Sequence, residues 1–361
     1  MNNFMRIAFL SSSRSIIPPL KTGGIEWATY YLIRELVKRG HEITLYAAPG
    51  SKIRGVKIRE ISPFPTFIRQ KYANFQERIT NFYDFSSYVD FFSLGENEKF
   101  DLIFCTNYLF YEILPFAKWS NIPIISQICY PHNEIYPYIK ERLKRLENVY
   151  YLPGSKFIKS VMPDLPYLEP VYPSIDPNDF PFSRQAGDYL FFIGRICPEK
   201  GVNLAIRAAL ESKKKLIIAG GISETNFNYF NEIIKPYIDN KKIIYVGEVD
   251  LKTRVKLYQG ALALLFPIQW DEPCGNVMIE SMMCGTPIIA FNRAAVKEVV
   301  KNNTSGIIVK DGDVDAMSKA ILRIKGINRQ KVREHAKKNF SIGKEADKFE
   351  KICRKIIKIK N

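Results

Sequence analysis

The stretch ALALLFPIQWDEPCGNVMIESMMCGTPIIAF (261–291) has the pattern of a strand, a helix and a second strand in succession. The apolar run at 261–266 is typical of a buried strand, and a loop follows it as far as Gly275. Because proline suits the approach to a helix but not its interior, the pattern predicts a helix over about 276–283. The second apolar run follows closely. Two buried strands joined by a helix predict a parallel sheet with crossover helices.

The same alternation runs along the whole chain of 361 residues, which is more than one hydrophobic core usually covers. Strand-like runs such as MRIAFLSS, HEITLYA, YLFFIG and KIIYVG alternate with helix-like runs, one of them over 108–119. Six prolines between 163 and 181 exclude a regular element there, because proline removes a backbone donor. We therefore expect an α/β protein with two doubly wound, Rossmann-like parallel-sheet domains, 1–170 and 171–340, facing a central cleft.

The composition excludes several classes of protein. With 46% apolar and 25% charged residues the chain is ordinary for a soluble globular protein, and an apolar run such as 261–268 is too short to span a membrane. The start has no charged leader, and the six cysteines show no metal-binding spacing, so we expect reduced thiols and a cytoplasmic location. The net charge of +16 favours anionic partners such as nucleotide phosphates, acidic lipid headgroups or nucleic acid.

Two carboxylates in the opening stretch, Glu272 and Glu280, stand eight positions apart. If the segment were fully helical, a rise of ~1.5 Å per residue would separate them by about 12 Å, which suits the two ends of an elongated ligand. A nucleotide sugar has this form, since carboxylates can accept hydrogen bonds from the hydroxyl groups at each end. The N–H groups of Gly275, Asn276 and Val277 begin the helix and predict an anion site for the phosphates between those ends.

Cations and glycines on other loops extend this prediction. In FFIGRICPEKG (191–201), Arg195 and Lys200 lie between a strand and a helix, where they would stabilise charge that develops on a diphosphate leaving group. Gly23 and Gly24 precede the first helix. They either let the backbone approach the diphosphate from the opposite wall or only form a turn.

Together these motifs resemble glycosyltransferase family 4, which has the GT-B fold, and within it the subgroup that contains the glycosyltransferase of the avilamycin pathway. The resemblance covers most of the chain and is densest in the C-terminal half. It is carried by TGGIEWATYYLIRELVKRGHEITLYA (22–47), YLFFIGRICPEKG (189–201), YVGEVD (245–250) and WDEPCGNVMIESMMCGTPIIAF (270–291).

The resemblance implies a retaining transferase that needs neither a metal ion nor a cofactor. It implies front-face attack, in which a phosphate oxygen takes the proton of the acceptor hydroxyl. The catalytic residues that it implies are Glu272 on the sugar hydroxyls, Arg195 and Lys200 on the diphosphate, and His132 near the acceptor. The donor-binding residues that it implies are Glu280 on the ribose, the backbone at Gly275, Asn276 and Val277, Val246 and Glu248 at the base, and Gly23 and Gly24. It also implies that residues 341–361 form a helix that crosses back to the N-terminal domain.

The expected donor is a nucleotide-activated hexose, with UDP-glucose as the first hypothesis and GDP-mannose as the second. The expected acceptor is a glycan or a lipid-linked saccharide. A nucleic-acid partner is not expected, because the basic residues follow no base-reading module. The alternatives are a sugar phosphorylase or nucleotide-sugar epimerase on the same fold, or a nucleic-acid-binding protein that uses the basic tail. Cys274 and Asn276 replace residue types that are commoner in the family, which leaves the identity of the sugar open.

Three further segments each allow two interpretations. DGDVD (311–315) is either an acidic metal site or a turn that caps the next helix, since Leu322 stands where a calcium loop needs Glu. The aromatic and basic segment 62–92 is either a platform for the acceptor or a long helix packed on the N-terminal sheet. The tail at 349–360 has an apolar stripe edged by lysines, which packs on the N-terminal domain or lies peripherally on an anionic membrane, at its inner face.

Overall fold

The computed structural model describes residues 4–21, 23–66, 73–107 and 109–360. Thr22, at the start of the first family motif, and residues 67–72 of the aromatic segment lie outside the described residues. The chain divides into two compact units, Met1–Pro173 with Ile342–Asn361, and Ser174–Ser341. Within the described ranges, no helix combines the length and the apolar composition that crossing a membrane requires.

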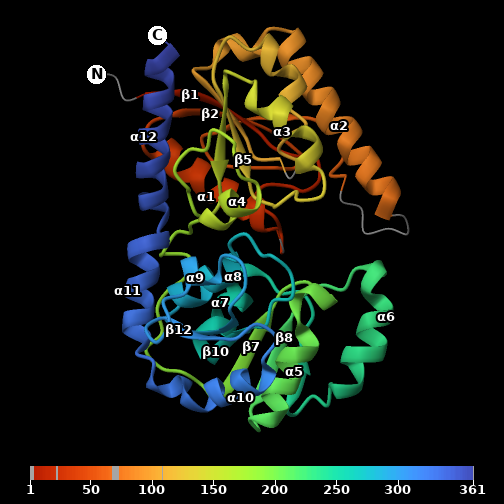
Figure 1. The fold of residues 1–361 in the computed structure, drawn as a ribbon, viewed down its shortest axis with the longest axis vertical. Coiled ribbons are helices and arrows are strands. Elements are labelled where there is room, and N and C mark those ends of the chain that lie inside the picture. Colours follow the sequence, from red (N-terminus) through yellow and green to blue (C-terminus); the bar gives the residue numbers. More distant parts are fainter. Residues whose placement is uncertain (1–3, 22, 67–72, 108, 361) are drawn as a thin grey trace. The chain divides into compact units, whose positions relative to one another are not determined.

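The described part of the first unit forms a six-stranded parallel sheet in the order β3-β2-β1-β4-β5-β6, of which Figure 1 labels β1, β2 and β5. Its strands are β1 (Arg6–Leu10), β2 (Glu42–Ala47), β3 (Lys57–Glu60), β4 (Leu102–Cys105), β5 (Ile124–Ile128) and β6 (Val149–Pro153). Its helices are α1 (Gly24–Lys38), α2 (Ala73–Ser93), α3 (Tyr136–Lys144), α4 (Lys156–Val161) and α12 (Ile342–Lys360), with the short 3-10 helices η1 (Glu96–Lys99) and η2 (Leu114–Trp119). The order reverses between β1 and β4, which makes this the topological switch point of the sheet.

Different helices cover the two faces of this sheet, because successive side chains of a strand point to opposite sides. On one face Ala8 of β1 belongs to the same apolar cluster as Tyr88 of α2. On the other face the rings of Phe9 and Phe104 lie 5.1 Å apart, and Phe104 lies 4.9 Å from Phe349 of α12. The apolar stripe of the tail is therefore buried in the first unit, as the packing interpretation predicts.

Ion pairs also hold α12 beside α1 (Figure 1). Arg39, at the end of α1, donates to Asp347 at 2.9 Å and to Glu350 at 3.3 Å, and Nε2 of His41 lies 3.2 Å from the same Glu350 oxygen. Although burial opposes ionisation of Glu350, the hydrogen bonds from His41 and Arg39 hold its pKa below the ordinary value. Both of these acids of α12 are thus paired with the guanidinium of Arg39 in the same unit.

The described part of the second unit repeats this topology, with six parallel strands in the order β12-β11-β10-β7-β8-β9. Its strands are β7 (Tyr189–Ile193), β8 (Lys215–Ala219), β9 (Ile243–Tyr245), β10 (Ala261–Phe266), β11 (Ile288–Phe291) and β12 (Gly306–Val309). Its helices are α5 (Val202–Glu211), α6 (Phe227–Tyr229), α7 (Leu251–Gly260), α8 (Asn276–Met283), α9 (Val296–Val299), α10 (Val314–Arg323) and α11 (Arg329–Phe340). Short helical turns are η3 (Pro198–Lys200), η4 (Glu224–Asn226), η5 (Phe230–Ile234), η6 (Lys235–Tyr237) and η7 (Ile324–Gly326). Here the switch point lies between β7 and β10.

Local predictions can be compared with the observed elements. The predicted helix after the opening loop is confirmed, since α8 spans Asn276–Met283. The cap interpretation of DGDVD is confirmed as well, because Asp313 accepts from the N–H of Ala316 at 2.8 Å at the start of α10. The helix predicted over 108–119 is wrong: its described part contains only turns and η2, and Pro115 lacks the N–H that a continuing helix needs.

Helix α2 accounts for most of the described aromatic segment. Tyr88 and Phe91 are buried in the core of the first unit, so the helix packs on the sheet as the second interpretation predicts. Phe82 and Phe85 of this helix are 65% and 47% exposed, and the ring of Phe85 also lies 5.0 Å from that of Phe116, between centroids.

Candidate functional site

The loops that follow β7 and β10 start on either side of the switch point of the second sheet, where open α/β sheets bind ligands. The first loop ends in η3 with Lys200, and the second contains Trp270 and Glu272. A backbone hydrogen bond of 2.8 Å from the N–H of Gln269 to the carbonyl oxygen of Glu199 joins the two loops. The topology thus brings together a cation and a carboxylate that are 72 positions apart in the chain.

Lys200, Glu272 and Trp270 form one interacting group. The Lys200 ammonium is paired with Oε2 of Glu272, and the indole Nε1 of Trp270 donates to the same oxygen at 3.1 Å. The ammonium also lies 4.8 Å from the centroid of the Trp270 ring, within reach of a cation–π interaction. The side chains of Lys200 and Glu272 are only 17% and 14% exposed, so water screens this pair less than a surface pair.

Glycine makes the close approach of these loops possible. Gly201 follows η3 with a φ of 70°, and a Cβ there would overlap the carbonyl oxygen of Pro267 in the second loop. Likewise, a Cβ at Gly220, after β8, would overlap the carbonyl oxygen of Gly194, after β7. Backbone atoms are therefore packed against one another at these strand ends, and the side chain of Arg195 is exposed beside them.

Glu280 lies in α8, where its side chain is buried within the second unit. The residue is 4% exposed, and its Oε2 accepts from the Tyr258 hydroxyl at 2.9 Å and lies 3.3 Å from Nε of Arg254. Burial raises the pKa of Glu280, while Arg254 and the Tyr258 hydroxyl oppose that rise. Both partners come from α7, so this helix fixes the position of the carboxylate.

The start of α8 and the end of β9 hold the other predicted residues of this unit. Gly275 precedes α8 with a φ of 74°, and Asn276 and Val277 are the first two helical residues. Val246 is 42% exposed after β9, and the carboxylate of Glu248 lies against the loop that follows β8. The predicted residues of the second unit thus lie on loops and helix ends that follow its strands, except Glu280.

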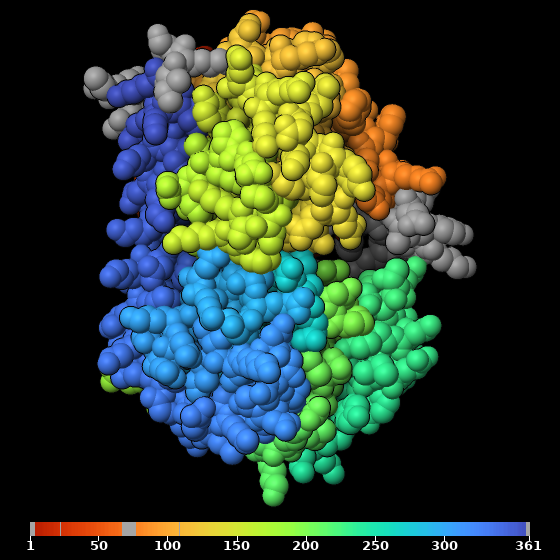
Figure 2. Space-filling model, in the orientation of Figure 1, coloured from red at the N-terminus to blue at the C-terminus, as the bar shows by residue number. Residues whose placement is uncertain are grey.

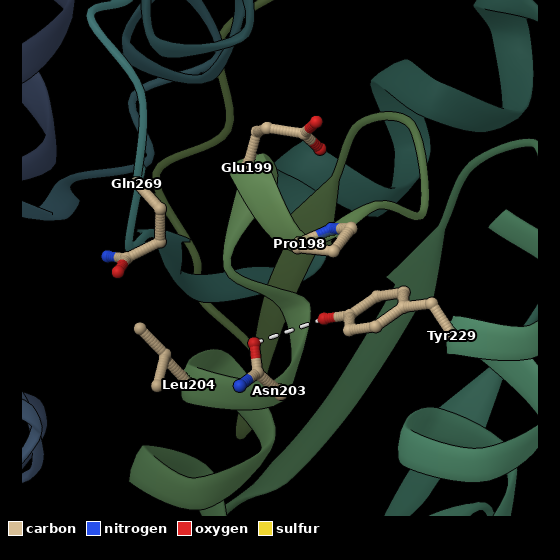
Figure 3. A pocket seen from close by; sticks show the side chains of 6 residues that line it. All are labelled: Pro198, Glu199, Asn203, Leu204, Tyr229 and Gln269. Carbon is tan, nitrogen blue, oxygen red and sulfur yellow. Dashed lines mark hydrogen bonds between the residues drawn. The ribbon is translucent and has the colours of Figure 1, made fainter. Parts of the chain in front are cut away.

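A cavity of about 360 Å³ borders the same two loops (Figure 3). The Tyr229 hydroxyl donates to Oδ1 of Asn203 at 3.1 Å across it. Its lining consists of Pro198, Glu199, Asn203, Leu204, Tyr229 and Gln269. Since two of these residues neighbour Lys200 and Trp270 in the chain, the cavity lies beside the candidate site, and the sequence had not suggested it.

His132 belongs to the first unit and follows β5. It is 8% exposed, and its ring lies 5.7 Å from the ring of Phe110, 5.4 Å from that of Tyr111 and 5.0 Å from that of Tyr130, between centroids. An aromatic shell therefore fixes the orientation of this imidazole.

Gly23 and Gly24 begin α1. Gly23 has a φ of 149°, and a Cβ there would lie 2.8 Å from Pro19 and equally near the carboxylate of Glu26. Gly24 is the first helical residue. The turn therefore requires glycine at position 23, and the predicted approach of this backbone to a diphosphate stays a prediction.

A buried polar network that the sequence analysis did not identify lies at the switch point of the first sheet. Asp84 of α2 is 1% exposed and accepts from the N–H of Ser13 at 2.6 Å and from Nδ2 of Asn107 at 3.0 Å. The same amide nitrogen lies 3.5 Å from Oε2 of Glu112. Burial, together with the charges of Asp84 and Glu77, raises the pKa of Glu112 to about 8.

Glu112→Gln is expected to stabilise the protein increasingly as the pH rises. Between the ordinary pKa of 4.5 and the raised value of about 8, the folded state holds a proton that the unfolded state has lost, so the wild type loses stability across this window. The glutamine variant does not have this loss of stability. The difference between its melting temperature and that of the wild type should therefore grow from pH 5 to pH 8 and reach about 2–4 °C. This expected difference is kept small because Glu112 is only half-buried and water screens its charge. Thermal unfolding at several pH values measures it. Glu147→Gln, at an exposed position, serves as the control, and an advantage that does not change with pH would contradict the prediction.

Family models match both halves of the chain. Residues 179–340 match the model described as glycosyl transferases group 1, and residues 22–161 match the model described as Glycosyltransferase Family 4. An uncharacterized glycosyltransferase of Methanocaldococcus jannaschii is 24% identical, and the alignment covers 85% of this chain and 86% of that protein. The matches thus agree on the class of enzyme from both halves.

Solved structures share the fold over nearly the whole chain. A glycosyltransferase involved in avilamycin A biosynthesis matches with a TM-score of 0.72 and 20% identity, over 98% of both chains. The Anabaena protein HepE, solved in complex with UDP-glucose, matches with a TM-score of 0.73 and 14% identity, over 97% of this chain and 100% of that one. The chain is therefore a family 4-like glycosyltransferase with the GT-B fold.

Proposed function

We propose that this glycosyltransferase retains the configuration of the sugar and moves a hexose from a nucleotide-diphosphate sugar to a hydroxyl group of a glycan or lipid-linked saccharide. UDP-glucose is the first candidate donor and GDP-mannose the second. The reaction uses neither a metal ion nor a cofactor. The observation that carries the proposal is the shielded pair of Lys200 and Glu272 at the switch point of the second sheet.

The chemical step follows from the charges of this site. The bond between the anomeric carbon and the oxygen of the diphosphate breaks, while the acceptor hydroxyl attacks that carbon from the same face. The proton of the hydroxyl passes to an oxygen of the leaving diphosphate. Negative charge grows on the diphosphate, and the ammonium of Lys200 and the guanidinium of Arg195 stabilise it. Because Lys200 is largely shielded from water, its charge acts with little screening.

When the donor binds, Lys200 and Glu272 separate, and each of them contacts a part of the donor. Lys200 turns from Glu272 to the diphosphate, and the released carboxylate accepts hydrogen bonds from hydroxyl groups of the sugar. Trp270 holds Glu272 through its indole N–H in the free protein and keeps the carboxylate oriented when the lysine leaves. Glu272 thus binds the sugar from a position that is already set.

The phosphates, ribose and base of the donor bind to other loops and helices of the second unit. The N–H groups of Gly275, Asn276 and Val277, at the start of α8, bind phosphate oxygens. Glu280, which α7 fixes, accepts hydrogen bonds from the ribose, and the end of β9 at 246–248 faces the base.

The first unit contributes His132 near the acceptor and the sugar, and the backbone of Gly23 and Gly24 near the diphosphate. The complex of HepE with UDP-glucose supports the choice of a nucleotide-sugar donor and of UDP-glucose as the first one to test. The net charge of +16 also favours an anionic donor.

A thermal-shift panel in the presence of EDTA tests the donor. UDP-glucose, GDP-mannose and their free nucleoside diphosphates are each added in excess, and the true donor is expected to raise the melting temperature. A ligand at 100 times its Kd adds about 2.7 kcal/mol to the free energy of unfolding, because it binds only the folded state. Failure of every nucleotide sugar to shift the melting temperature would contradict the proposal.

With the donor known, proton NMR of the product tests the stereochemistry. The anomeric configuration of the transferred hexose is expected to equal that of the donor, and transfer is expected to continue in EDTA. An inverted product would overturn the front-face mechanism, and loss of transfer in EDTA that added magnesium restores would overturn metal independence.

A further inference from the structure

The outward face of α12 has an unusual composition. Among the side chains of this helix that the structure describes, those exposed to solvent are Lys344, Asp347, Lys348, Lys351, Lys355 and Lys358. The lysines recur at spacings of three and four residues, which places them in one row along the helix. At ~1.5 Å per residue the row is about 21 Å long. Figure 2 shows the side chains of α12, in dark blue, along one edge of the first unit.

The other side chains of α12 are committed to the first unit. Phe349 packs on Phe104, and Cys353 and Ile356 are 0% and 2% exposed, so the apolar stripe is not available to enter a membrane. Asp347, the exposed acid, is paired with Arg39. The row of lysines is therefore a fixed ridge of positive charge on a helix that the unit holds in place.

We propose that this lysine ridge, Lys344, Lys348, Lys351, Lys355 and Lys358, docks the protein on an anionic phospholipid surface. Like charges three and four residues apart repel one another and weaken a helix, and anionic headgroups relieve that repulsion. Lysine is a compact charge that pairs with phosphate without demanding a particular geometry. Near an anionic leaflet each lysine adds to the attraction, which fades within a Debye length. Docking is thus electrostatic, without insertion of α12.

The shape of the ridge favours a membrane over nucleic acid. A flat bilayer can meet all five lysines of a straight row at once, whereas the backbone of a duplex curves away from it. The exposed side chains of α12 include no aromatic ring within the described range, and single-stranded nucleic acid is usually bound by stacking its bases on such rings. The proposal does not depend on which sugar is transferred.

Vesicle sedimentation with the full chain tests the ridge. The variant K344Q/K348Q/K351Q/K355Q/K358Q removes five charges while keeping residues of similar helix propensity. The control removes five exposed lysines from the second unit, as K252Q/K256Q/K297Q/K310Q/K319Q. Vesicles contain either equal parts of phosphatidylglycerol and phosphatidylcholine or phosphatidylcholine alone. Thermal unfolding, with and without the donor, is measured in parallel to show that both variants fold and bind it.

The wild type and the control are expected to bind the anionic vesicles, and the ridge variant to bind them at least about tenfold more weakly. Binding should disappear when salt rises to about 1 M, where the Debye length is about 3 Å. The proposal is overturned if the wild type does not bind, if the control loses as much as the ridge variant, or if a DNA duplex of mixed sequence binds the ridge more tightly than the vesicles do.

Discussion

Lys200→Ala is expected to lower kcat for hexose transfer by about 10²–10³-fold, because it removes a shielded cation from the departing diphosphate. Its effect on KM should be smaller, since the charge on the diphosphate is greatest in the transition state. Arg195→Ala is expected to cost less, because its side chain is exposed and water screens its charge. Steady-state kinetics with the donor from the thermal-shift panel measure both variants.

The control for this comparison is Lys241→Ala, at an exposed position of the same unit, which should keep wild-type kinetics. Melting temperatures of the three variants separate loss of catalysis from loss of folding. If Lys200→Ala retained the kcat of the wild type while folding normally, the assigned role of the cation would be wrong, although the enzyme class would stand.

Gly201→Ala is expected to lower the free energy of unfolding by about 4 kcal/mol, near the upper end of single substitutions. The residue has a φ of 70°, which is strained for alanine, and the added Cβ would overlap the carbonyl oxygen of Pro267. Since the obstacle is backbone rather than the end of a flexible side chain, the loops that carry Lys200 and Glu272 must separate. Urea unfolding followed by tryptophan fluorescence measures the loss.

Gly326→Ala is the matched control, because no atom beyond its neighbours in the chain lies within 4 Å of its Cβ position, and its φ is not in the left-handed region. It is expected to be neutral or slightly stabilising. If Gly201→Ala unfolded at the same urea concentration as the wild type, the prediction would be wrong. The two loops could then move apart with little loss in the free energy of unfolding.

Periodicity and burial explain which elements were predictable. Strands such as β10, with every side chain buried, give an apolar run that is visible in the sequence, and α8 is marked by the proline and glycine before it. The edge strand β3 was missed because its sequence, KIRE, is largely exposed and has no apolar run. Over 108–119 the apolar spacing is typical of a helix, but Pro115 limits the described part of this segment to turns and the short η2.

In the candidate site, sequence motifs predicted individual residues but not the contacts between residues of different helices. Lys200 and Glu272 were named from two loops, and parallel topology places both loops at one switch point. The ion pair between Arg254 and Glu280 was not predictable from the sequence. The two residues are 26 positions apart, and that spacing does not specify that their helices, α7 and α8, are in contact. The network around Asp84 was missed for the same reason, since its members come from segments that only the fold brings together.

The contribution of α12 to the core of the first unit bears on the order of synthesis. A ribosome makes Phe9 and Phe104 early, but Phe349, which packs against both rings, only after the whole second unit. Domains of a nascent chain commonly fold in the order in which they emerge. In this protein the first unit cannot complete its apolar core until α12 has been synthesised, whereas the second unit can fold before that. A chaperone that shields this apolar surface during translation would therefore bind the N-terminal part of the nascent chain.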